Sequence, residues 1–211
     1  MTALLEAKGL GEAEIAKRVR MTFAGKRQLE LKAFERVALA TISRKQVKVT
    51  HLNRERAERV ERTISPQELV HYRDNWYIDA WCHLRKGIRS FGLDAIEDVT
   101  ILEAAAHEVD TIELRRVTQG SYGIFAGQAT AWAVLRFTKH RAQLVEDELW
   151  HPQQMAIQEP DGSYLLKVPY SDDRELMGDI LRFGADVQVL EPKELRAKVQ
   201  KTLLEAVGKY I

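Results

Sequence analysis

One hairpin near the middle of the chain constrains the fold more than any other stretch. Its first strand is the aromatic run Trp76-Tyr77-Ile78, which follows an Asp74-Asn75 turn and continues to Cys82. A tight turn through Lys86-Gly87 leads into a second strand that carries Arg89. Aromatic and apolar residues favour strands, and a short turn with glycine favours an antiparallel pair. The pattern predicts a β-hairpin with cationic groups at one end.

Alternation along this hairpin assigns its side chains to two faces. Tyr77, Asp79, Trp81 and His83 share one face of the first strand, and the residues between them share the other. Both faces are mostly apolar, as in a strand that closes into a small barrel and is also covered outside. In the second strand, Arg89 shares its row with apolar residues, so it should lie at a rim or a pocket or pair with an acid.

The segment before the hairpin predicts a helix and two more strands. Over residues 30–43, apolar residues at helical spacing predict a core-facing stripe. Its members are Leu31, Phe34, Ala38 and Ile42. A strand over 46–51 places His51 at the end of an inward row, and a strand over 58–64 aligns Arg62 with Val60 and Ile64. Pro66 is expected to end that strand because it has no amide donor for the ladder.

The C-terminal third predicts a second folding unit. Strands are expected over 131–138, 155–159, 164–169 and 185–190, with helices over 139–149 and 192–210. A further helix opens with an Asp172/Glu175 capping box and ends at Gly184. The last helix has a stripe of Leu195, Val199, Leu203 and Val207. The resulting order β-α-β-β-α-β-α is typical of the ferredoxin-like fold.

Two ordered blocks of motifs also resemble a known family. Arg62-Thr63-Ile64-Ser65-Pro66, the Trp76-Tyr77-Ile78 run and Arg89-Ser90-Phe91-Gly92-Leu93-Asp94 resemble the WYL domain of bacterial transcriptional regulators. Leu149-Trp150-His151-Pro152, Phe183-Gly184-Ala185-Asp186 and Leu190-Glu191-Pro192 resemble the C-terminal extension of the same regulators. In two places the chain departs from the family pattern: Ala95 replaces an Arg, and His51 replaces a Tyr.

The predicted fold class is therefore α+β, in four segments. Residues 1–29 form a helical linker, with short helical stretches over 2–7 and 12–21. Residues 30–106 form a five-stranded Sm-like barrel with a preceding helix, as the resemblance implies. Residues 107–129 connect it to a ferredoxin-like extension over 130–211. The winged helix-turn-helix that precedes the barrel in these regulators has no counterpart in the first thirty residues, so sequence-specific duplex DNA binding is not expected of this chain alone.

Bulk composition narrows the function classes. No apolar run approaches the ~20 residues needed to cross a bilayer, and the N-terminus has no apolar signal core, which indicates a cytoplasmic protein. One cysteine, Cys82, excludes an internal disulfide. From Ile15 to Arg62 there are 14 Lys or Arg against 5 acidic residues, whereas from Arg141 to Glu194 there are 12 acidic residues against 5 basic ones. Alternating Arg and Glu over 54–62 are expected mostly to solvate a loop and an exposed strand face, while the local excess of positive charge favours a first half that faces an anion.

The leading functional interpretation follows from the resemblance and this basic half. It implies the effector-sensing and dimerisation part of a transcriptional regulator, whose barrel binds a nucleotide or a short single-stranded nucleic acid. The ligand-binding residues expected are His51, Arg62, Tyr77, His83, Arg85 and Arg89. The resemblance also implies a homodimer, and the large apolar side chains of Trp132, Trp150 and Phe183 are candidates for the contact.

Alternative interpretations stay open at this point. No catalytic motif, metal-ligand spacing or cofactor loop occurs, so no enzyme activity, metal or cofactor is expected. A phosphodiester-acting enzyme would need a base or a metal that the motifs do not offer. A structural dimerisation module with a degenerate pocket is favoured by Ala95. An internal salt bridge of Arg62 or Arg89 with Asp79 or Asp94 would also remove the need for a ligand.

Overall fold

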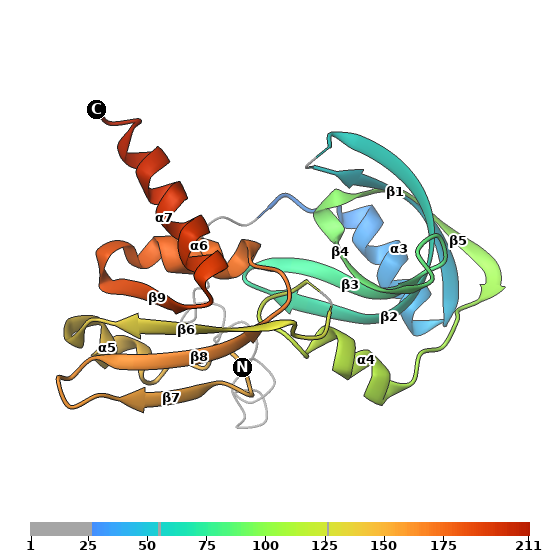
Figure 1. The fold of residues 1–211 in the computed structure, drawn as a ribbon. Helices are drawn as coiled ribbons and strands as arrows, with labels where there is room; N and C mark the ends of the chain where they lie inside the picture. Colours follow the sequence, from blue (N-terminus) through green and yellow to red (C-terminus); the bar gives the residue numbers. More distant parts are fainter. Residues whose placement is uncertain (1–26, 55, 126) are drawn as a thin grey trace, which may run out of the picture.

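The computed structural model describes residues 27–54, 56–125 and 127–211. Within them, buried apolar residues form two separate cores, one in each half of the chain. The helical stretches predicted over 2–7 and 12–21 lie outside the described residues. Each core belongs to one antiparallel sheet, and Figure 1 shows the two sheets side by side.

Five strands form the first sheet. They are β1 (Lys45–Asn53), β2 (Glu58–Tyr72), β3 (Asn75–Cys82), β4 (Gly87–Gly92) and β5 (Ile96–Ala105), in the order β4-β3-β2-β1-β5. The 3-10 turn η1 (Leu93–Ala95) joins β4 to β5. The sheet curls around helix α3 (Leu31–Ile42), and α4 (Thr111–Thr118) follows β5 below it (Figure 1). The predicted hairpin of β3 and β4 is confirmed, with Ala80 opposite Arg89.

The prediction of a closed barrel is wrong, although five strands are present. The edge strands β4 and β5 do not pair with each other among the described residues. Helix α3 packs against β1, β2 and β5 and contributes Ala33, Val37 and Ala40 to the core. Apolar side chains on the concave face are thus buried against a helix, so burial does not require the two edges to meet.

Helix α3 has the predicted length but turns a different face to the sheet. Its fully buried residues are Ala33, Val37 and Ala40, whereas Leu31 is 66% and Ile42 80% exposed. Small side chains on the buried face let the helix lie close to the strands, and Val37 fills the centre of the contact. Of the predicted stripe, Phe34 packs against this core and Ala38 is partly buried, whereas Leu31 and Ile42 face solvent, so the buried face is rotated from the predicted one.

Strand β2 continues through Pro66, which was predicted to end it. Its first half pairs with β1 as far as Ile64, and its second half pairs with β3 from Ile64 to Tyr72. Pro66 lies in the second half, where β2 pairs with β3 on one side and has no strand on the other among the described residues. The register with β3 shifts just after Pro66. A missing amide is tolerated at such a position. The turn that joins β2 to β3 is formed by Arg73 and Asp74, whose φ angles are 45° and 63°.

The second sheet has the predicted order of elements. The chain runs through β6 (Ala131–Phe137), α5 (Lys139–Val145), β7 (Met155–Gln158), β8 (Tyr164–Tyr170), α6 (Arg174–Phe183), η2 (Gly184–Asp186), β9 (Val187–Glu191) and α7 (Lys193–Val207). The strand order is β7-β8-β6-β9, and all neighbours are antiparallel. One face of this sheet is buried against residues of α5, α6 and α7.

Helix α6 ends at Gly184 as predicted, with φ at 56°, but the capping box does not form. Asp172 accepts a hydrogen bond from the Arg174 amide at 3.0 Å. Glu175 does not return to the start of the helix, because its Oε2 accepts the Ile124 amide at 2.8 Å. The glutamate therefore joins α6 to the connector between the two sheets.

Packing of the last helix and of the large aromatic residues also differs from expectation. Leu195 and Val199 of α7 are buried, but Leu203 and Val207 are 41% and 53% exposed. Trp150 and Phe183 stack on each other within their own domain, with ring centroids 5.9 Å apart. They are thus committed to the core of that domain, and only Trp132 of the three proposed contact residues is exposed.

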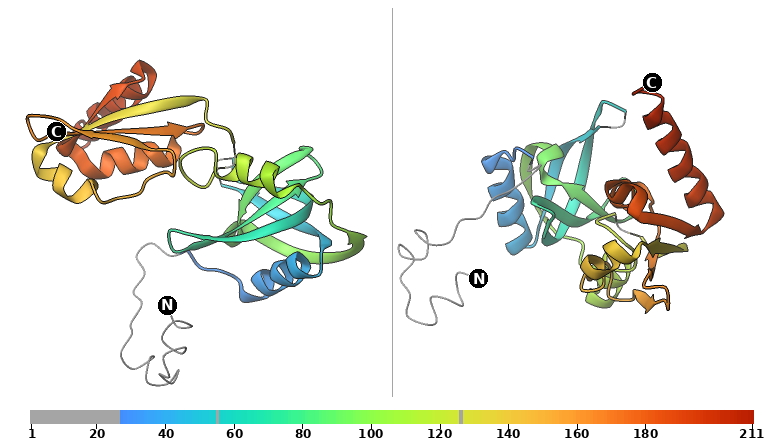
Figure 2. Two further views of the ribbon diagram at one scale, coloured as in Figure 1. Left: turned by 90° about the horizontal axis from the view of Figure 1, so that it is seen from below. Right: turned by 90° about the vertical axis from the view of Figure 1, so that its left-hand side faces the viewer.

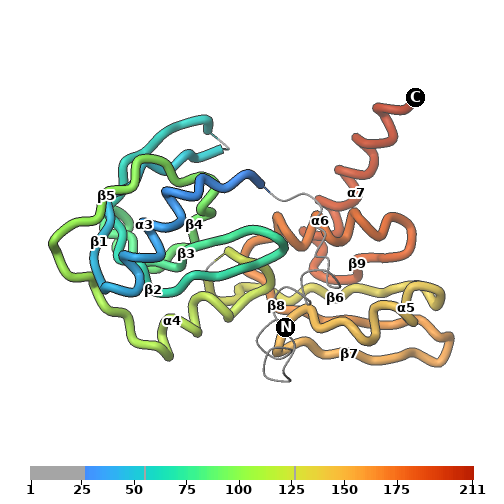
Figure 3. Tube along the Cα trace, turned by 180° about the vertical axis from the view of Figure 1, so that it is seen from behind, coloured from blue at the N-terminus to red at the C-terminus, as the bar shows by residue number. Residues whose placement is uncertain are grey.

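The tip of the β2–β3 hairpin joins the two domains. It reaches from the first sheet toward α6, as the views in Figures 2 and 3 show. Arg73 at its tip donates to both carboxylate oxygens of Asp179 in α6, at 3.2 and 2.7 Å. The hydroxyl of Tyr122 donates to the same carboxylate at 2.6 Å. No helix among the described residues is long and apolar enough to cross a membrane.

Candidate functional site

A pocket of about 630 Å³ lies where the first sheet meets the connector and α6. The first sheet contributes the end of β1, the outer part of β4 and the η1 turn, the connector contributes Phe125, and the second domain contributes Arg174 and Glu175. Four guanidinium groups line it: Arg27, Arg54, Arg89 and Arg174. Three of the six predicted ligand residues also line it: His51, Tyr77 and Arg89.

Arg89 is the arginine of the pocket with the least internal compensation. Its Nη1 donates to the carbonyl of the neighbouring Ile88, and no carboxylate pairs with it among the described residues. In contrast, Arg54 and Arg27 pair with Asp94, and Arg174 pairs with Asp172. Arg89 therefore carries a positive charge that the structure leaves to solvent or to a ligand.

Arg62 lies on the same concave face, next to His51. It is half-buried, and its Nη1 lies 3.8 Å from the Sγ of Cys82. Its Nε is buried without a hydrogen-bond partner in the described structure. Neither Arg62 nor Arg89 pairs with Asp79 or Asp94 within the described ranges, so the internal salt bridge considered from the sequence is not formed. A buried guanidinium without an acid is unfavourable unless an anion approaches it.

His51 stands between these cations and stays neutral at pH 7. Burial lowers the pKa of its imidazole, and the charges of Arg62 and Arg54 lower it further. Its ring packs against Phe91 with centroids 5.2 Å apart, and its Nδ1 is buried without a partner among the described residues. The imidazole can therefore offer one neutral polar edge at the base of the pocket.

The charged groups in and around the pocket have a positive net charge. Five guanidinium groups, the four of the lining and Arg62, are matched by three carboxylates, those of Asp94, Glu175 and Asp172. The excess is two positive charges. Arginine suits phosphate and carboxylate groups because it donates paired hydrogen bonds in a fixed plane. The charged groups of the site therefore sum to a net positive charge.

The remaining predicted residues have different positions. Tyr77 lies on the convex face of β3 and reaches the pocket beside Gly92, its partner in β4. His83 is hydrogen bonded to the Ser65 hydroxyl at 2.9 Å and does not line the pocket. Arg85 is exposed in the turn that joins β3 to β4, at the other end of the hairpin. The structure therefore brings together His51, Tyr77 and Arg89, with Arg62 behind them, and leaves His83 and Arg85 outside.

Sequence reasoning missed the wall that the second domain provides. The guanidinium of Arg174 lies 4.0 Å from the centroid of the Phe125 ring, which forms a flat surface of cation and aromatic ring. Burial raises the pKa of the nearby Glu175. Phe125 belongs to the aromatic-glycine segment Tyr122-Gly123-Ile124-Phe125, but no local pattern placed that segment against the first sheet.

Asp79 does not line the pocket, and burial of its charged carboxylate destabilises the folded state. It is 3% exposed, and its Oδ1 accepts the hydroxyl of Ser90. Burial raises its pKa from 3.8 to about 6, and the nearby Glu68 adds to the effect. Since the folded pKa lies above the unfolded one, the folded state loses stability as the pH rises through this interval, and the loss is complete above pH 6.

Asp79→Asn is therefore expected to stabilise the protein at pH 7 by about 3 kcal/mol and to have little effect below pH 4. Urea unfolding at both pH values measures the difference. Asp98→Asn, at an exposed position of β5, serves as the control. Equal stability of the Asp79 variant and the parent at pH 7 would contradict the buried charge.

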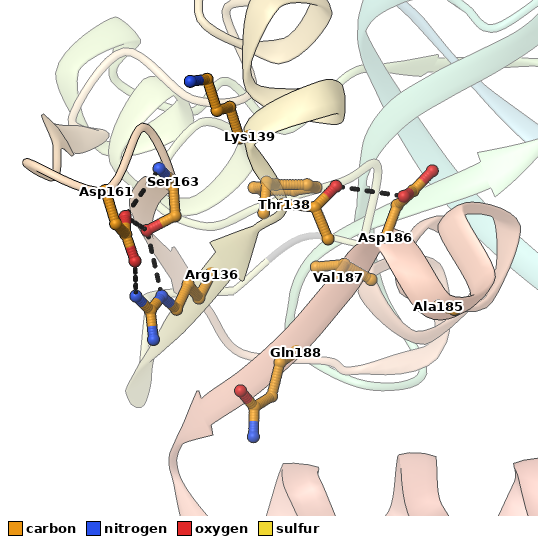
Figure 4. A pocket seen from close by; sticks show the side chains of 10 residues that line it. Arg136, Thr138, Lys139, Asp161, Ser163, Ala185, Asp186, Val187 and Gln188 are labelled. Carbon is orange, nitrogen blue, oxygen red and sulfur yellow. Dashed lines mark hydrogen bonds and ion pairs between the residues drawn. The ribbon is translucent and has the colours of Figure 1, made fainter.

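Another depression, of about 430 Å³, lies at the far end of the second domain (Figure 4). Most of its charged groups are paired: Arg136 contacts Asp161 and Ser163, and Asp186 contacts Thr138 and Arg141, whereas Lys139 has no ion pair among the described residues. The paired groups are satisfied internally, so this depression makes a weaker anion site than the interdomain pocket. No group of three or more potential metal ligands occurs in the described part of the chain.

Comparison with known proteins identifies both domains. A family model of the WYL domain matches residues 32–101, and one of the WCX domain matches residues 129–207. The uncharacterized HTH-type transcriptional regulator YobV of Bacillus subtilis is 27% identical over 147 residues, which are 69% of this chain and 46% of that protein. Protein PafC of Mycobacterium leprae is 25% identical over 149 residues, 71% of this chain and 44% of that protein. The chain thus spans somewhat less than half the length of these relatives.

Solved structures with a similar fold include a CRISPR Cas-related protein, with a TM-score of 0.52 at 10% identity over 85% of this chain and 51% of that one. Proteasome accessory factor B/C (PafBC) of Arthrobacter aurescens matches 89% of this chain and 29% of its own, with a TM-score of 0.39 at 24% identity. The two matched domains follow each other in the order that the motifs indicated. The chain belongs to the WYL-domain family, in the arrangement in which a WCX domain follows the WYL domain.

Proposed function

We propose that this chain is the effector-sensing part of a transcriptional regulator and that it binds an anionic ligand in the interdomain pocket. The ligand class is a nucleotide or a short single-stranded nucleic acid. The observation that carries the proposal is the excess of two positive charges in a pocket of about 630 Å³, with Arg62 and Arg89 lacking any carboxylate partner among the described residues. An anion would offset the partial desolvation of Arg62 and give the exposed Arg89 a counter-charge.

The shape of the pocket supports a ligand with both phosphate and a flat ring. Arg89 and Arg54 lie on the side of the first sheet, and the Phe125–Arg174 surface lies on the side of the second domain. Aromatic side chains and guanidinium planes stack on bases whatever their sequence. A ligand that contacts both sides would couple its binding to the relative position of the two domains, because it binds best where both sides can reach it.

The proposal is tested by calorimetry with a 5′-phosphorylated dinucleotide, a cyclic dinucleotide and ATP. We expect the phosphorylated di- to tetranucleotides or the cyclic dinucleotide to bind more tightly than ATP, with an affinity that falls as salt is raised. Absence of binding by any nucleotide at low salt would refute the sensing role. Turnover of the ligand, with or without added divalent metal, would favour an enzyme instead, whereas we expect binding without turnover.

Ala95 allows a gain-of-function experiment at the same site. It stands where the family usually has an arginine, and it lines the pocket while its own side chain is 7% exposed. An Ala95→Arg variant adds a guanidinium to the pocket and is expected to strengthen nucleotide binding. Unchanged affinity in a correctly folded variant would remove support for this position.

We further propose that the chain forms a homodimer through the second domain. That domain exposes several apolar side chains on α7: Leu203, Leu204 and Val207 are 41%, 65% and 53% exposed. A helix with an exposed apolar face is suited to isologous pairing of two identical chains.

We also assign the second domain to the ferredoxin-like fold on its strand order β7-β8-β6-β9, and the first domain to an opened form of the Sm-like barrel.

Sedimentation is expected to give roughly twice the chain mass of 24.2 kDa for the parent. Leu204→Glu places a charge on the exposed face of α7 and is expected to shift the protein to the monomer, whereas Leu31→Glu, on exposed α3 in the first domain, is not. If the parent sedimented as a monomer at micromolar concentration, the proposed homodimer would be wrong. If Leu204→Glu stayed dimeric, the dimer contact would not involve the exposed face of α7.

A further inference from the structure

Asp94 lies inside the basic pocket and faces the guanidinium groups that an anionic ligand would use. Its Oδ2 accepts a hydrogen bond from Arg54 Nη2 and lies 3.5 Å from Arg27 Nη1. Its side chain is 4% exposed, while those of Arg54 and Arg27 are 47% and 48% exposed. The carboxylate is therefore covered by two half-exposed arginines, and it already fills one anion position of the pocket.

Gly92 creates the space for this carboxylate. A Cβ at position 92 would lie 2.7 Å from Asp94 Oδ1, closer than two such atoms approach in proteins. The φ angle of Gly92 is −65°, which every residue adopts, so the glycine is needed for space and not for its backbone freedom. Asp94 Oδ1 itself is buried without a hydrogen-bond partner in the described structure.

These observations define how Asp94 is held. One oxygen of the carboxylate is stabilised by the charges of Arg27 and Arg54, and the other has no donor among the described residues. It projects from the short η1 turn, in a fixed position against Gly92, whereas the arginines are long, flexible and half in water. When an anion enters, the arginines are the partners that can turn toward it.

We propose that Asp94 is an internal competitor of the effector: it occupies the anion position formed by Arg27 and Arg54, and a bound ligand takes these two guanidinium groups from it. This inference rests on the proposed function of the pocket. Transfer of the arginines leaves a buried carboxylate with fewer partners, which opposes part of the gain from binding. Asp94 thereby sets a threshold, and groups that carry more than one negative charge pass it more easily than singly charged ones.

The first test measures the affinity of the 5′-phosphorylated dinucleotide for the parent and for Asp94→Asn. The amide keeps the shape of the side chain and removes its charge, so the variant is expected to bind about tenfold more tightly, the scale of one charge-assisted contact. Asp186→Asn is the matched control, because Asp186 also pairs with an arginine, Arg141 at 2.9 Å, but outside the pocket. Equal or weaker binding by Asp94→Asn overturns the inference, since a carboxylate that merely positions the arginines would lower affinity when lost.

A second measurement does not depend on the nucleotide. In thermal unfolding at constant ionic strength, inorganic phosphate is expected to raise the Tm of Asp94→Asn more than that of the parent or of Asp186→Asn, because it replaces the lost carboxylate between Arg27 and Arg54. Asp94→Ser provides the same test if the amide variant does not fold. If phosphate stabilised the variant but no nucleotide bound to the parent or to any variant, the proposed nucleotide sensing would be wrong and the role of Asp94 as a competitor would be supported. If nucleotide bound to the parent but the Asp94 variants showed neither tighter binding nor stronger phosphate stabilisation, the competitor role would be wrong and nucleotide sensing would be supported.

Discussion

Replacing Asp179 by alanine is expected to lower the free energy of unfolding by about 3 kcal/mol, the scale for breaking a buried charged network. Asp179 is 5% exposed and accepts hydrogen bonds from Arg73 at 2.7 and 3.2 Å and from the Tyr122 hydroxyl at 2.6 Å. The substitution leaves the hydroxyl of the buried Tyr122 beside an arginine with no shared acceptor. Because Arg73 belongs to the first domain and Asp179 to the second, the loss also weakens the contact between them.

Urea unfolding of a small set of variants separates this network from ordinary surface pairs. Arg73→Ala is expected to have a smaller effect, since Arg73 is 46% exposed and Tyr122 keeps its bond to Asp179. Glu205→Ala removes an exposed pair with Lys201 and is expected to change stability by well under 1 kcal/mol. If Asp179→Ala resembled the Glu205 control, the hairpin tip would not hold the domains together.

Arg89→Ala and Arg62→Ala are each expected to weaken binding of the best nucleotide by about 1.5–3 kcal/mol, the value of a hydrogen bond to a charged group. Neither residue pairs with a carboxylate among the described residues, so neither substitution breaks an internal ion pair. The domain should therefore stay folded while affinity falls by roughly ten- to 150-fold. Calorimetric titration of both variants measures the effect.

Arg85→Ala is the matched control for these two variants. It removes the same charge from the same sheet, but from the exposed turn at the other end of the hairpin. Its affinity should stay close to that of the parent, with a slight decrease at low salt from the lost long-range field. If all three variants bound alike, the ligand would not use the concave face of the first sheet.

Local patterns in the sequence were sufficient for most helices and strands, though not for the second half of β2 or for α4, and for the direction of most strand side chains. The period of two along residues 75–92 identified β3 and β4, and it placed Arg89 in an apolar row. The same rule put His51 and Arg62 on the face that the structure shows to be concave. In the C-terminal third, turn residues and helical spacing gave all seven elements in their correct order. These properties depend on neighbours along the chain, and the sequence displays such neighbours directly.

Tertiary structure decided which faces meet and what completes the site. The stripe of α3 was only partly right: Phe34 packs against the core, but Ala33 and Ala40 are buried in place of Leu31 and Ile42. The barrel stayed open because α3 buries the concave face without closure. The Phe125–Arg174 wall and the position of Asp94 under Arg27 and Arg54 join residues far apart in sequence. Such contacts depend on how the side chains of whole helices and strands fit together in three dimensions. The local periodicity of the sequence does not contain that information.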